Sequence, residues 1–251
     1  MAVKKEISAE ITVAPLKRGS VRLRIIGTTP LFQNRMSAKV KMGLLTGTAK
    51  KTRAEKVGLK HHPIEEFRDS AEIVPDGPTA LGLQVVSVKA AMATAALETP
   101  GLTKSAAQRL LFMPGDRIPL YGVPKLRMDV VRSADMNRTP DVRSRAYLPK
   151  WGAEIDIQFI TPQLSVSSVV TLLCNAGVLI GVGDFRQEKG KGGYGLFRVL
   201  GEGEDDEEWD ELVLEHGRAA QEAALSDPEY AGGDTADLMA HYLSEVKRRA
   251  A

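Results

Sequence analysis

Strict alternation of apolar and polar side chains recurs in well-separated segments of this chain. It is clearest in residues 153–160, where Ile155, Ile157 and Phe159 alternate with polar neighbours. Because successive side chains of a strand point to opposite faces, such segments predict strands with one face on a core. We expect strands at residues 7–13, 20–26, 116–121, 125–132, 142–148, 153–160 and 195–200. The first two form a hairpin around residues 17–19, or an N-terminal arm precedes the first core strand.

Helical patterns lie between these strands. Residues 85–97 carry apolar side chains at helical spacing before Pro100-Gly101, residues 103–111 predict a short helix, and residues 165–175 begin with capping serines and end at Ala176-Gly177. Strand, helix, two strands, strand, helix and strand is the order of two split βαβ units. We therefore expect an α+β, ferredoxin-like core.

Charge divides the chain near residue 200. Residues 201–251 hold 15 acidic and four basic side chains, and subtracting these from the totals of 32 and 34 leaves residues 1–200 with a net charge of +13. Such asymmetry predicts a basic binding surface beside an acidic tail, and phosphate backbones are the commonest partner of such a surface. We expect a nucleic-acid-binding domain at 1–200 and a tail at 201–251, an acidic linker followed by helical segments at 208–225 and 234–249.

A second concentration of basic side chains lies in residues 34–70, where small residues separate the lysines and arginines and no sustained helical or strand period is present. We expect a long basic insertion without regular structure that orders on binding a polyanion.

The sharpest motif is the glycine-rich stretch 181–195, in which six of fifteen residues are glycine and Arg186, Lys189 and Lys191 lie among them. Glycines let a backbone approach a ligand closely, the cations supply charge, and Phe185 and Tyr194 can stack on bases. The stretch is neither a Walker loop nor a dinucleotide fingerprint, because it follows a helix and precedes a strand. The simpler alternative is a turn-rich connection.

The layout resembles the RAMP superfamily, the RNA-binding proteins of CRISPR effector complexes, over about residues 20–200. The likeness rests on the long loop before the first helix, the arginine-bearing strand around Val142-Arg-Ser-Arg and the late glycine-rich loop. It is greatest to the backbone subunits that polymerise along guide RNA, although the insertion is short for them and the acidic tail is foreign to them. The resemblance implies self-association through the insertion, and the stretch Gly181-Val-Gly-Asp-Phe-Arg is also similar to bacteriophage proteins.

Catalytic and cofactor motifs are missing from the sequence. No Ser/His/Asp or Cys/His arrangement is recognisable, the spacing of Asp129, Asp135 and Asp141 is not that of a metal site, and the single cysteine, Cys174, is expected to be buried and inert. We expect no cofactor and no metal. A binding protein is a stronger expectation than an enzyme. The alternative is a RAMP-like endoribonuclease that uses His61 or His62 as general base.

The leading hypothesis is a sequence-tolerant protein that binds RNA or single-stranded DNA, assembling along the strand as a filament. A phage assembly or host-interaction protein with a basic face for an acidic partner is a further alternative. The tail either competes for the basic groove, recruits a partner or is a solvated extension. We expect a bacterial or infected-host cytoplasmic location, since no membrane span or secretory signal is apparent. The expected nucleic-acid contacts are Arg35, Lys39, Lys41, Lys50, Lys51, Arg53, Lys89, Arg143, Arg145, Arg186, Lys189, Lys191, Gly192, Gly193 and Tyr194.

Overall fold

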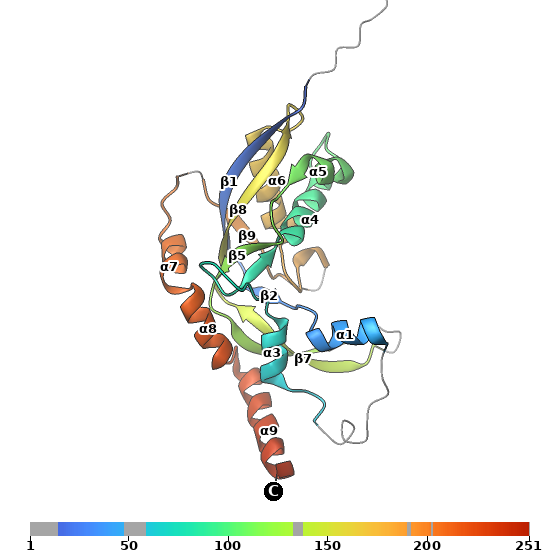
Figure 1. Ribbon diagram of the computed structural model, residues 1–251, viewed down its shortest axis with the longest axis vertical. Coiled ribbons are helices and arrows are strands. Elements are labelled where there is room, and N and C mark those ends of the chain that lie inside the picture. The colour runs from blue at the N-terminus through green and yellow to red at the C-terminus, as the bar shows by residue number, and fades with distance from the viewer. Residues whose placement is uncertain (1–14, 48–58, 133–137, 190–191, 202, 251) are drawn as a thin grey trace, which may run out of the picture.

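The computed structural model describes residues 15–47, 59–132, 138–189, 192–201 and 203–250, which form two antiparallel sheets flanked by helices (Figure 1). The larger sheet contains β1 (Lys17–Gly27), β3 (Gly82–Gln84), β4 (Leu111–Phe112), β5 (Arg117–Tyr121), β8 (Gly152–Thr161) and β9 (Phe197–Val199). Its order is β3-β5-β8-β1-β9, with β4 also paired to β8. The smaller sheet contains β2 (Leu31–Gln33), β6 (Lys125–Arg132) and β7 (Pro140–Leu148), in the order β2-β7-β6. The expected α+β class is confirmed.

Strands β1 and β8 form the centre of the larger sheet, paired from Lys17 opposite Thr161 to Ile26 opposite Gly152. The predicted alternation places Ile25 and Ile155 in the core, while the opposite face carries ion pairs such as Arg22 Nε to Asp156 Oδ1 at 2.6 Å. The hairpin expected around residues 17–19 is wrong, because β1 runs through them. The strand expected at residues 7–13 lies outside the described residues.

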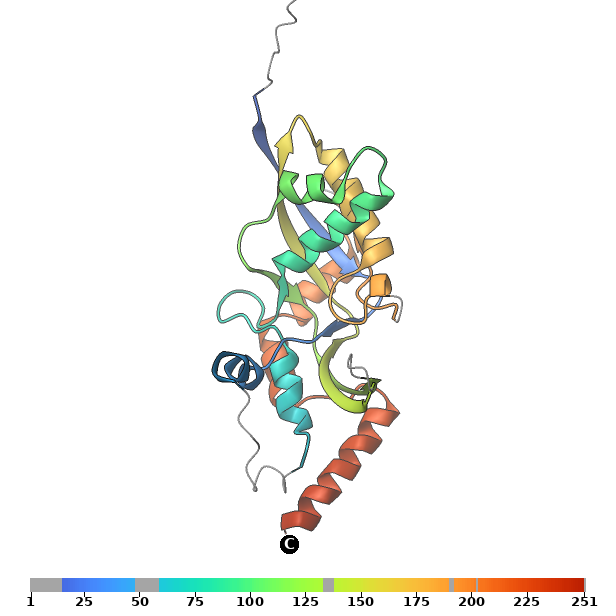
Figure 2. The ribbon, with the colours of Figure 1, turned by 90° about the vertical axis from the view of Figure 1, so that its right-hand side faces the viewer.

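One face of this sheet is covered by α4 (Val85–Ala95), α5 (Lys104–Leu110) and α6 (Val166–Asn175), as Figure 2 shows. A 3-10 turn (Ala96–Glu98) follows α4. Ser165 caps α6 by accepting a backbone N–H group, as the sequence predicts, and Thr103 caps α5 in the same way. The chain does not leave the helix at Ala176-Gly177. It continues through a π-helical turn (Ala176–Ile180) and ends at Gly181, whose φ of 74° suits glycine.

The basic insertion contains two helices, α1 (Ala38–Thr46) and α3 (Pro63–Ser70), so the expectation of irregular structure is wrong at both ends. Helix α1 begins at Ser37, whose side chain accepts the N–H of Val40, but it buries no apolar stripe and therefore leaves no helical period in the sequence. Helix α3 is too short to show one. It packs against β7 through Phe67, which is fully buried.

The acidic tail forms three helices, α7 (Glu207–Glu215), α8 (Arg218–Ser226) and α9 (Gly233–Ala250). The single helix expected at 208–225 is divided at His216-Gly217, where Gly122 N donates to His216 O. Trp209 and Leu212 pack on Ile26 and Leu200, on the sheet face opposite α4 and α6. The tail therefore differs from a solvated extension.

Gln221 of α8 joins the tail to the larger sheet, at the segment before β3 and at the end of β5. It is fully buried, accepts the N–H groups of Ala80 and Leu81 at 2.7 and 3.0 Å, and donates to Leu120 O and Gly122 O at 2.7 and 3.0 Å. Helix α9 continues past the body, with Met239 buried near β6 (Figure 1). Among the described residues, no helix is both long and apolar enough to cross a bilayer.

Candidate functional site

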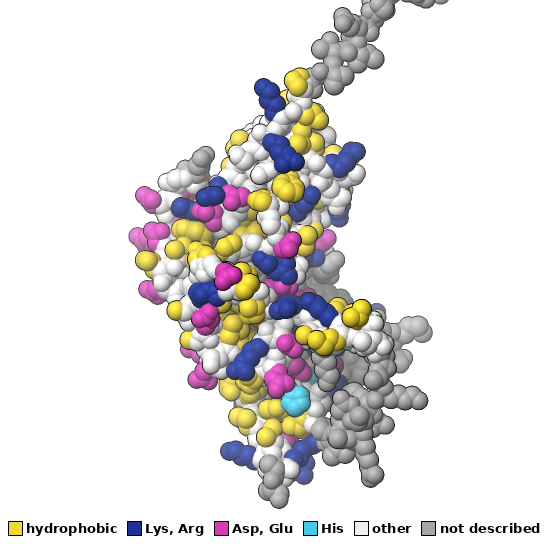
Figure 3. Space-filling view, viewed as in Figure 1, with side chains coloured by type: hydrophobic (Ala, Val, Ile, Leu, Met, Phe, Trp, Pro, Cys, Tyr) yellow, Lys and Arg dark blue, Asp and Glu magenta, His cyan; other side chains and the backbone are white. Residues whose placement is uncertain are grey.

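A cleft of about 600 Å³ lies between the segment leading into α1, one side of α3 along its length and the first half of β7. Helix α1, whose basic and apolar side chains are visible in Figure 3, lies beside the cleft. The residues that line it are Asn34, Arg35, Met36, Ser37, Val40, Lys60, His61, His62, Glu65, Glu66, Asp69, Ser70, Asp141, Val142, Arg143, Ser144 and Arg145. The cleft thus joins both ends of the basic insertion to the arginine-bearing strand.

Two predicted contacts, Arg35 and Arg143, converge on this cleft although 108 positions separate them in the chain. The backbone N–H of Arg35 donates to Ser70 O at 2.9 Å, which fixes the approach to α1. Arg143 lies opposite Asp129 in the β6–β7 ladder and its side chain is exposed. Neither guanidinium has a partner among the described residues, so both are available to an anion.

His61 and Lys60 occupy the inner end of the cleft. His61 Nδ1 lies 2.9 Å from Glu66 Oε1, and its Nε2 lies 2.9 Å from Asp141 Oδ1. Lys60 Nζ also bonds to Asp141 Oδ1. The Lys60 hydrogen bond, with that of His61, holds the pKa of Asp141 below its usual value. These contacts give two of the carboxylates that line the cleft hydrogen-bond partners, and Lys60 neutralises Asp141.

The geometry bears on the endoribonuclease alternative. A general base needs a ring nitrogen that can accept a proton from the substrate, and both nitrogens of His61 face carboxylate oxygens. His62 is exposed and precedes α3, where its backbone N–H donates to Glu66 Oε1 at 3.3 Å. The two histidines therefore differ: His62 is exposed, whereas His61 is half-buried and lies between two carboxylates.

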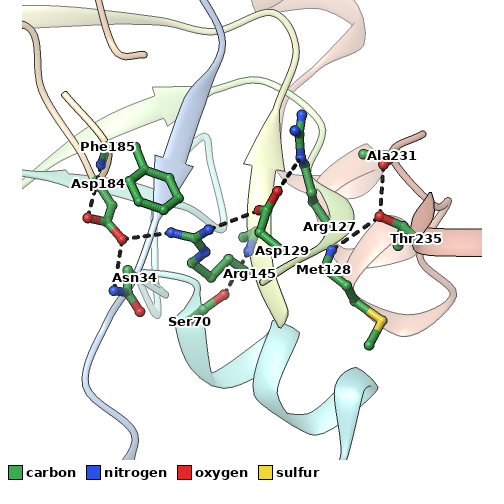
Figure 4. Close-up of polar contacts among 11 residues, drawn as sticks. Asn34, Ser70, Arg127, Met128, Asp129, Arg145, Asp184, Phe185, Ala231 and Thr235 are labelled. Atoms are coloured by element: carbon green, nitrogen blue, oxygen red, sulfur yellow. Dashed lines mark hydrogen bonds and ion pairs between the residues drawn. The ribbon is translucent and has the colours of Figure 1, made fainter. Parts of the chain in front are cut away.

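Arg145 is placed differently from Arg143, two residues away on the same strand. Its side chain is 2% exposed, and its guanidinium donates to Asp184 Oδ2 and to Asp129 Oδ2, each at 2.9 Å (Figure 4). Its Cζ atom lies 4.2 Å from the centre of the Phe185 ring and 4.6 Å from that of Phe32. Such a buried, twice-paired guanidinium is not available to phosphate, so we leave Arg145 out of the interface.

The glycine-rich loop is fastened to the smaller sheet by this arginine. Asp184 also accepts Asn34 Nδ2 at 2.9 Å, and Asp184 N donates to Phe32 O at 3.0 Å. Tyr194 packs edge-on against Phe32, with ring centres 4.8 Å apart, and so is not a free stacking platform. Arg186 is 20% exposed and pairs with Glu188 at 3.3 Å. Of the predicted glycines, Gly193 is exposed, whereas a Cβ at Gly192 would lie 2.2 Å from Phe185 O.

The remaining predicted contacts are dispersed or not described. Lys41 is exposed on α1, and Lys89 lies half-buried on α4, outside the lining of the cleft. Lys39 and Lys189 lie in a helix and a 3-10 turn (Gln187–Lys189), with side chains that are not described. Lys50, Lys51, Arg53 and Lys191 fall outside the described residues.

Sequence reasoning included Lys60 only among the lysines and arginines of residues 35–60 expected to hold phosphates, and it missed the aspartates that hold Arg145. Lys60 was one of many lysines in the insertion, and only its pairing with Asp141 separates it from them. Asp129 alternates with the apolar residues of β6. This alternation predicts that its side chain points away from the core, but it does not predict that Arg145 is its partner. Cys174 is half-buried, and burial raises the pKa of its thiol.

The carboxylates of the acidic tail pair with basic residues that lie outside the cleft. Arg198 bonds to Asp206 and Glu208 at 2.7 and 3.1 Å, and Lys150 bonds to Glu211 at 2.9 Å. In the described parts of the chain, no tail carboxylate pairs with Arg35, Lys60 or Arg143. Acidic side chains gather along the edge made by α7 and α8 in Figure 3.

One group of side chains in the tail has the spacing of metal ligands. Ligand atoms of Glu211, Glu215 and His216 lie within 4.8 Å of one another. The ammonium of Lys150 already supplies positive charge to Glu211, and exposed acidic groups of this kind are common without an ion. We assign no metal to it.

Comparison with known proteins identifies no relative. No protein-family model matches the chain, and no curated protein sequence matches it.

Proposed function

We propose that this protein binds the sugar-phosphate backbone of RNA or single-stranded DNA at the cleft between α1, α3 and β7, without reading sequence. The observation that carries the proposal is the convergence of Arg35 and Arg143, both without a partner among the described residues, on one cleft. Guanidinium groups bind phosphate oxygens through paired N–H donors. The exposed ammonium of Lys60 borders the same space while it neutralises Asp141.

The side chains around the cleft favour backbone over base recognition. Among its described lining residues there is no Phe, Tyr or Trp on which bases could stack, and the apolar ones are Met36, Val40 and Val142. The aromatic side chains that the sequence offered, Phe185 and Tyr194, are used internally against Phe32. Affinity from phosphate contacts alone is tolerant of sequence and sensitive to salt.

We also infer that the core is ferredoxin-like and of the RAMP type. In support, the four principal strands of the larger sheet occur in the order β5-β8-β1-β9, with α4 between β1 and β5 and α6 between β8 and β9. This is the strand order that two split βαβ units produce when they interleave. The β6–β7 hairpin and the basic insertion are additions that create the cleft.

Self-association is part of the proposal, and helix α1 is the surface we assign to it. Four apolar side chains of α1, Val40, Met42, Leu44 and Leu45, are between 51% and 87% exposed. Apolar side chains that gather on a surface helix mark contact sites. Copies that meet through α1 while bound to one strand would follow that strand as a filament.

The test is fluorescence anisotropy with labelled single-stranded RNA, single-stranded DNA and duplex DNA over a salt series. We expect tight binding to single strands, with an affinity that falls as salt rises. Arg35→Ala and Arg143→Ala should each weaken binding and lower the slope of log affinity against log salt by about 0.7, the value for one single-strand phosphate contact. Lys104→Ala, an exposed lysine on α5, is the matched control and should leave the slope unchanged.

Two results would contradict the proposal. Absence of binding to every nucleic acid at low salt would refute the nucleic-acid function outright. Equal loss of affinity in Lys104→Ala and Arg143→Ala would show a general charge effect, and the cleft would not be the site.

A further inference from the structure

Both ring nitrogens of His61 face carboxylate oxygens, an arrangement that two ring N–H groups would satisfy. Glu66 Oε1, which faces Nδ1, already accepts the backbone N–H of His62 at 3.3 Å. Asp141 Oδ1, which faces Nε2, already accepts Lys60 Nζ and the backbone N–H of Val142. Ionised carboxylates only accept hydrogen bonds, so the arrangement fits the imidazolium ring.

The residues that His61 joins belong to two different walls of the cleft. Glu66 lies on α3, and Asp141 lies on β7 two residues before Arg143. The ring is 25% exposed, so it exchanges protons with solvent while it bridges the walls. A neutral ring has one N–H and can keep only one of the two bonds, and its lone pair then faces a carboxylate oxygen.

We propose that His61 is a positioning residue of the binding cleft, whose imidazolium ties α3 to β7 and makes strand binding depend on pH. The inference rests on the proposed function for its effect on affinity, but not for its effect on stability. Protonated His61 ties the first half of α3 to the start of β7, while Phe67 and Ser70 pack the two elements together farther along. Loss of the proton frees the start of β7 or that part of α3, so that Arg143 is held less firmly for a strand that also contacts Arg35.

The charges around the ring agree with this role. Its partners Glu66 and Asp141 favour the charged form, and Lys60 compensates Asp141. The other titratable or charged groups that line the cleft are His62, Glu65 and Asp69 beside α3, Arg35 before α1 and Arg143 on β7. Histidine as a residue type changes charge between pH 5 and 8, so the experiment uses one pH value near each end of that range.

The experiment compares four proteins at pH 5.5 and pH 8.0 at constant ionic strength: the wild type, His61→Gln, His61→Arg and His62→Gln. The first readout is the thermal unfolding midpoint without ligand, and the second is the affinity for a labelled single strand. His62→Gln is the matched control, because it removes a neighbouring histidine whose ring is exposed.

We expect His61→Gln to have a lower unfolding midpoint than the wild type, and this deficit to be about 3 °C larger at pH 5.5 than at pH 8.0. Wild-type affinity should fall about tenfold from pH 5.5 to 8.0, the ratio for one hydrogen bond to a charged group. His61→Arg, which keeps charged donors at both pH values, should bind with little pH dependence and close to the low-pH wild type. His62→Gln should retain most of the wild-type fall.

Contrary outcomes separate the two proposals. If His61→Gln keeps the wild-type pH profile in both readouts, or if His62→Gln loses it equally, the role of His61 is refuted. If no strand binds to the wild type at either pH, the nucleic-acid function fails, while the midpoints still decide whether His61 ties the walls together. If His61→Gln does not fold, Glu66→Gln serves instead. Its amide can donate a hydrogen bond to the neutral ring of His61, so the unfolding midpoint of this variant should depend less on pH.

Discussion

Arg145 Nη1 donates to Asp184 Oδ2 at 2.9 Å, an ion pair that joins strand β7 to the glycine-rich loop. The second amino group of the same guanidinium bonds to Asp129 on β6, so one side chain connects three segments. The glycine-rich loop, which the sequence predicts to bind a ligand, is thereby held by contacts within the protein. Arg145 holds Asp184 near the start of the loop, and the ring of Phe185 covers that arginine.

Arg145→Met should lower the free energy of unfolding by about 3 kcal/mol. Removing one member of a buried ion pair typically costs about 3–5 kcal/mol, and the lower end applies because Asp129 and Asp184 are 22% and 36% exposed and can recover water. Urea unfolding followed by circular dichroism measures the change. Arg143→Met, two residues away on the same strand but exposed, is the control and should change stability by less than about 0.5 kcal/mol. Equal effects of the two substitutions would contradict the structural role of Arg145.

Gln221→Ala should also destabilise the fold by about 3 kcal/mol. Gln221 is fully buried. Its removal deprives the N–H groups of Ala80 and Leu81, and the carbonyls of Leu120 and Gly122, of the hydrogen bonds that its side chain makes. Each buried polar group without a partner costs about 1–3 kcal/mol, and partial rearrangement offsets some of the sum.

The control for Gln221 is its neighbour on α8. Glu222→Ala removes an exposed side chain that pairs with Arg218 at 3.0 Å, and should cost less than about 0.5 kcal/mol. If Gln221→Ala were no more destabilising than Glu222→Ala, the tail would not be fastened to the core through this residue.

The long strands of this fold could be predicted because their pattern is local. Apolar and polar side chains alternate over residues 125–130 and 153–159, within the strands expected at 125–132 and 153–160, and β6 and β8 match those strands to within one residue at each end. Strands β2, β3 and β4 have two or three residues, too few to show a period. They form because neighbouring strands supply their partners, which is tertiary information.

The candidate site was predictable in part, and the limit is shown by Arg143 and Arg145. Alternation puts both on one face of β7, but does not show that the glycine-rich loop covers only the second. The partner that buries Arg145 lies 39 positions away in the sequence. The role of His61 was equally hidden, because Asp141 lies 80 positions from it.

Acid should loosen the tail before it unfolds the core. The Arg198 hydrogen bond lowers the pKa of Asp206, and the Lys150 hydrogen bond lowers that of Glu211. A carboxyl group with a lowered folded-state pKa contributes stability above its unfolded pKa, about 4 for these types, and that stability is lost as pH falls through the folded value. Trp209, which packs from α7 onto Ile26 and Leu200, should therefore change fluorescence below about pH 4.

Asp206→Asn tests that assignment. Asn keeps the cap on the N–H of Trp209, which Asp206 Oδ1 accepts at 3.0 Å, but removes the ion pair with Arg198. The variant should be less stable than the wild type at pH 7, and the difference should shrink as pH falls below 4. A difference that persists unchanged at pH 3 would show that the ion pair does not hold the tail.

Removal of negative charge from the α3 wall should strengthen strand binding. Glu65 and Asp69 are exposed, line the cleft and have no side-chain partner in the parts of the chain that the structure describes, so they repel a phosphate backbone that approaches Arg35 and Arg143. Glu65→Gln with Asp69→Asn should raise affinity about fivefold at low salt, and the gain should vanish near 1 M salt, where the screening length is about 3 Å. Glu98→Gln, an exposed glutamate in the turn after α4, is the control for net charge and should leave affinity unchanged. An equal gain in the control would mean that overall charge, and not the cleft, governs binding.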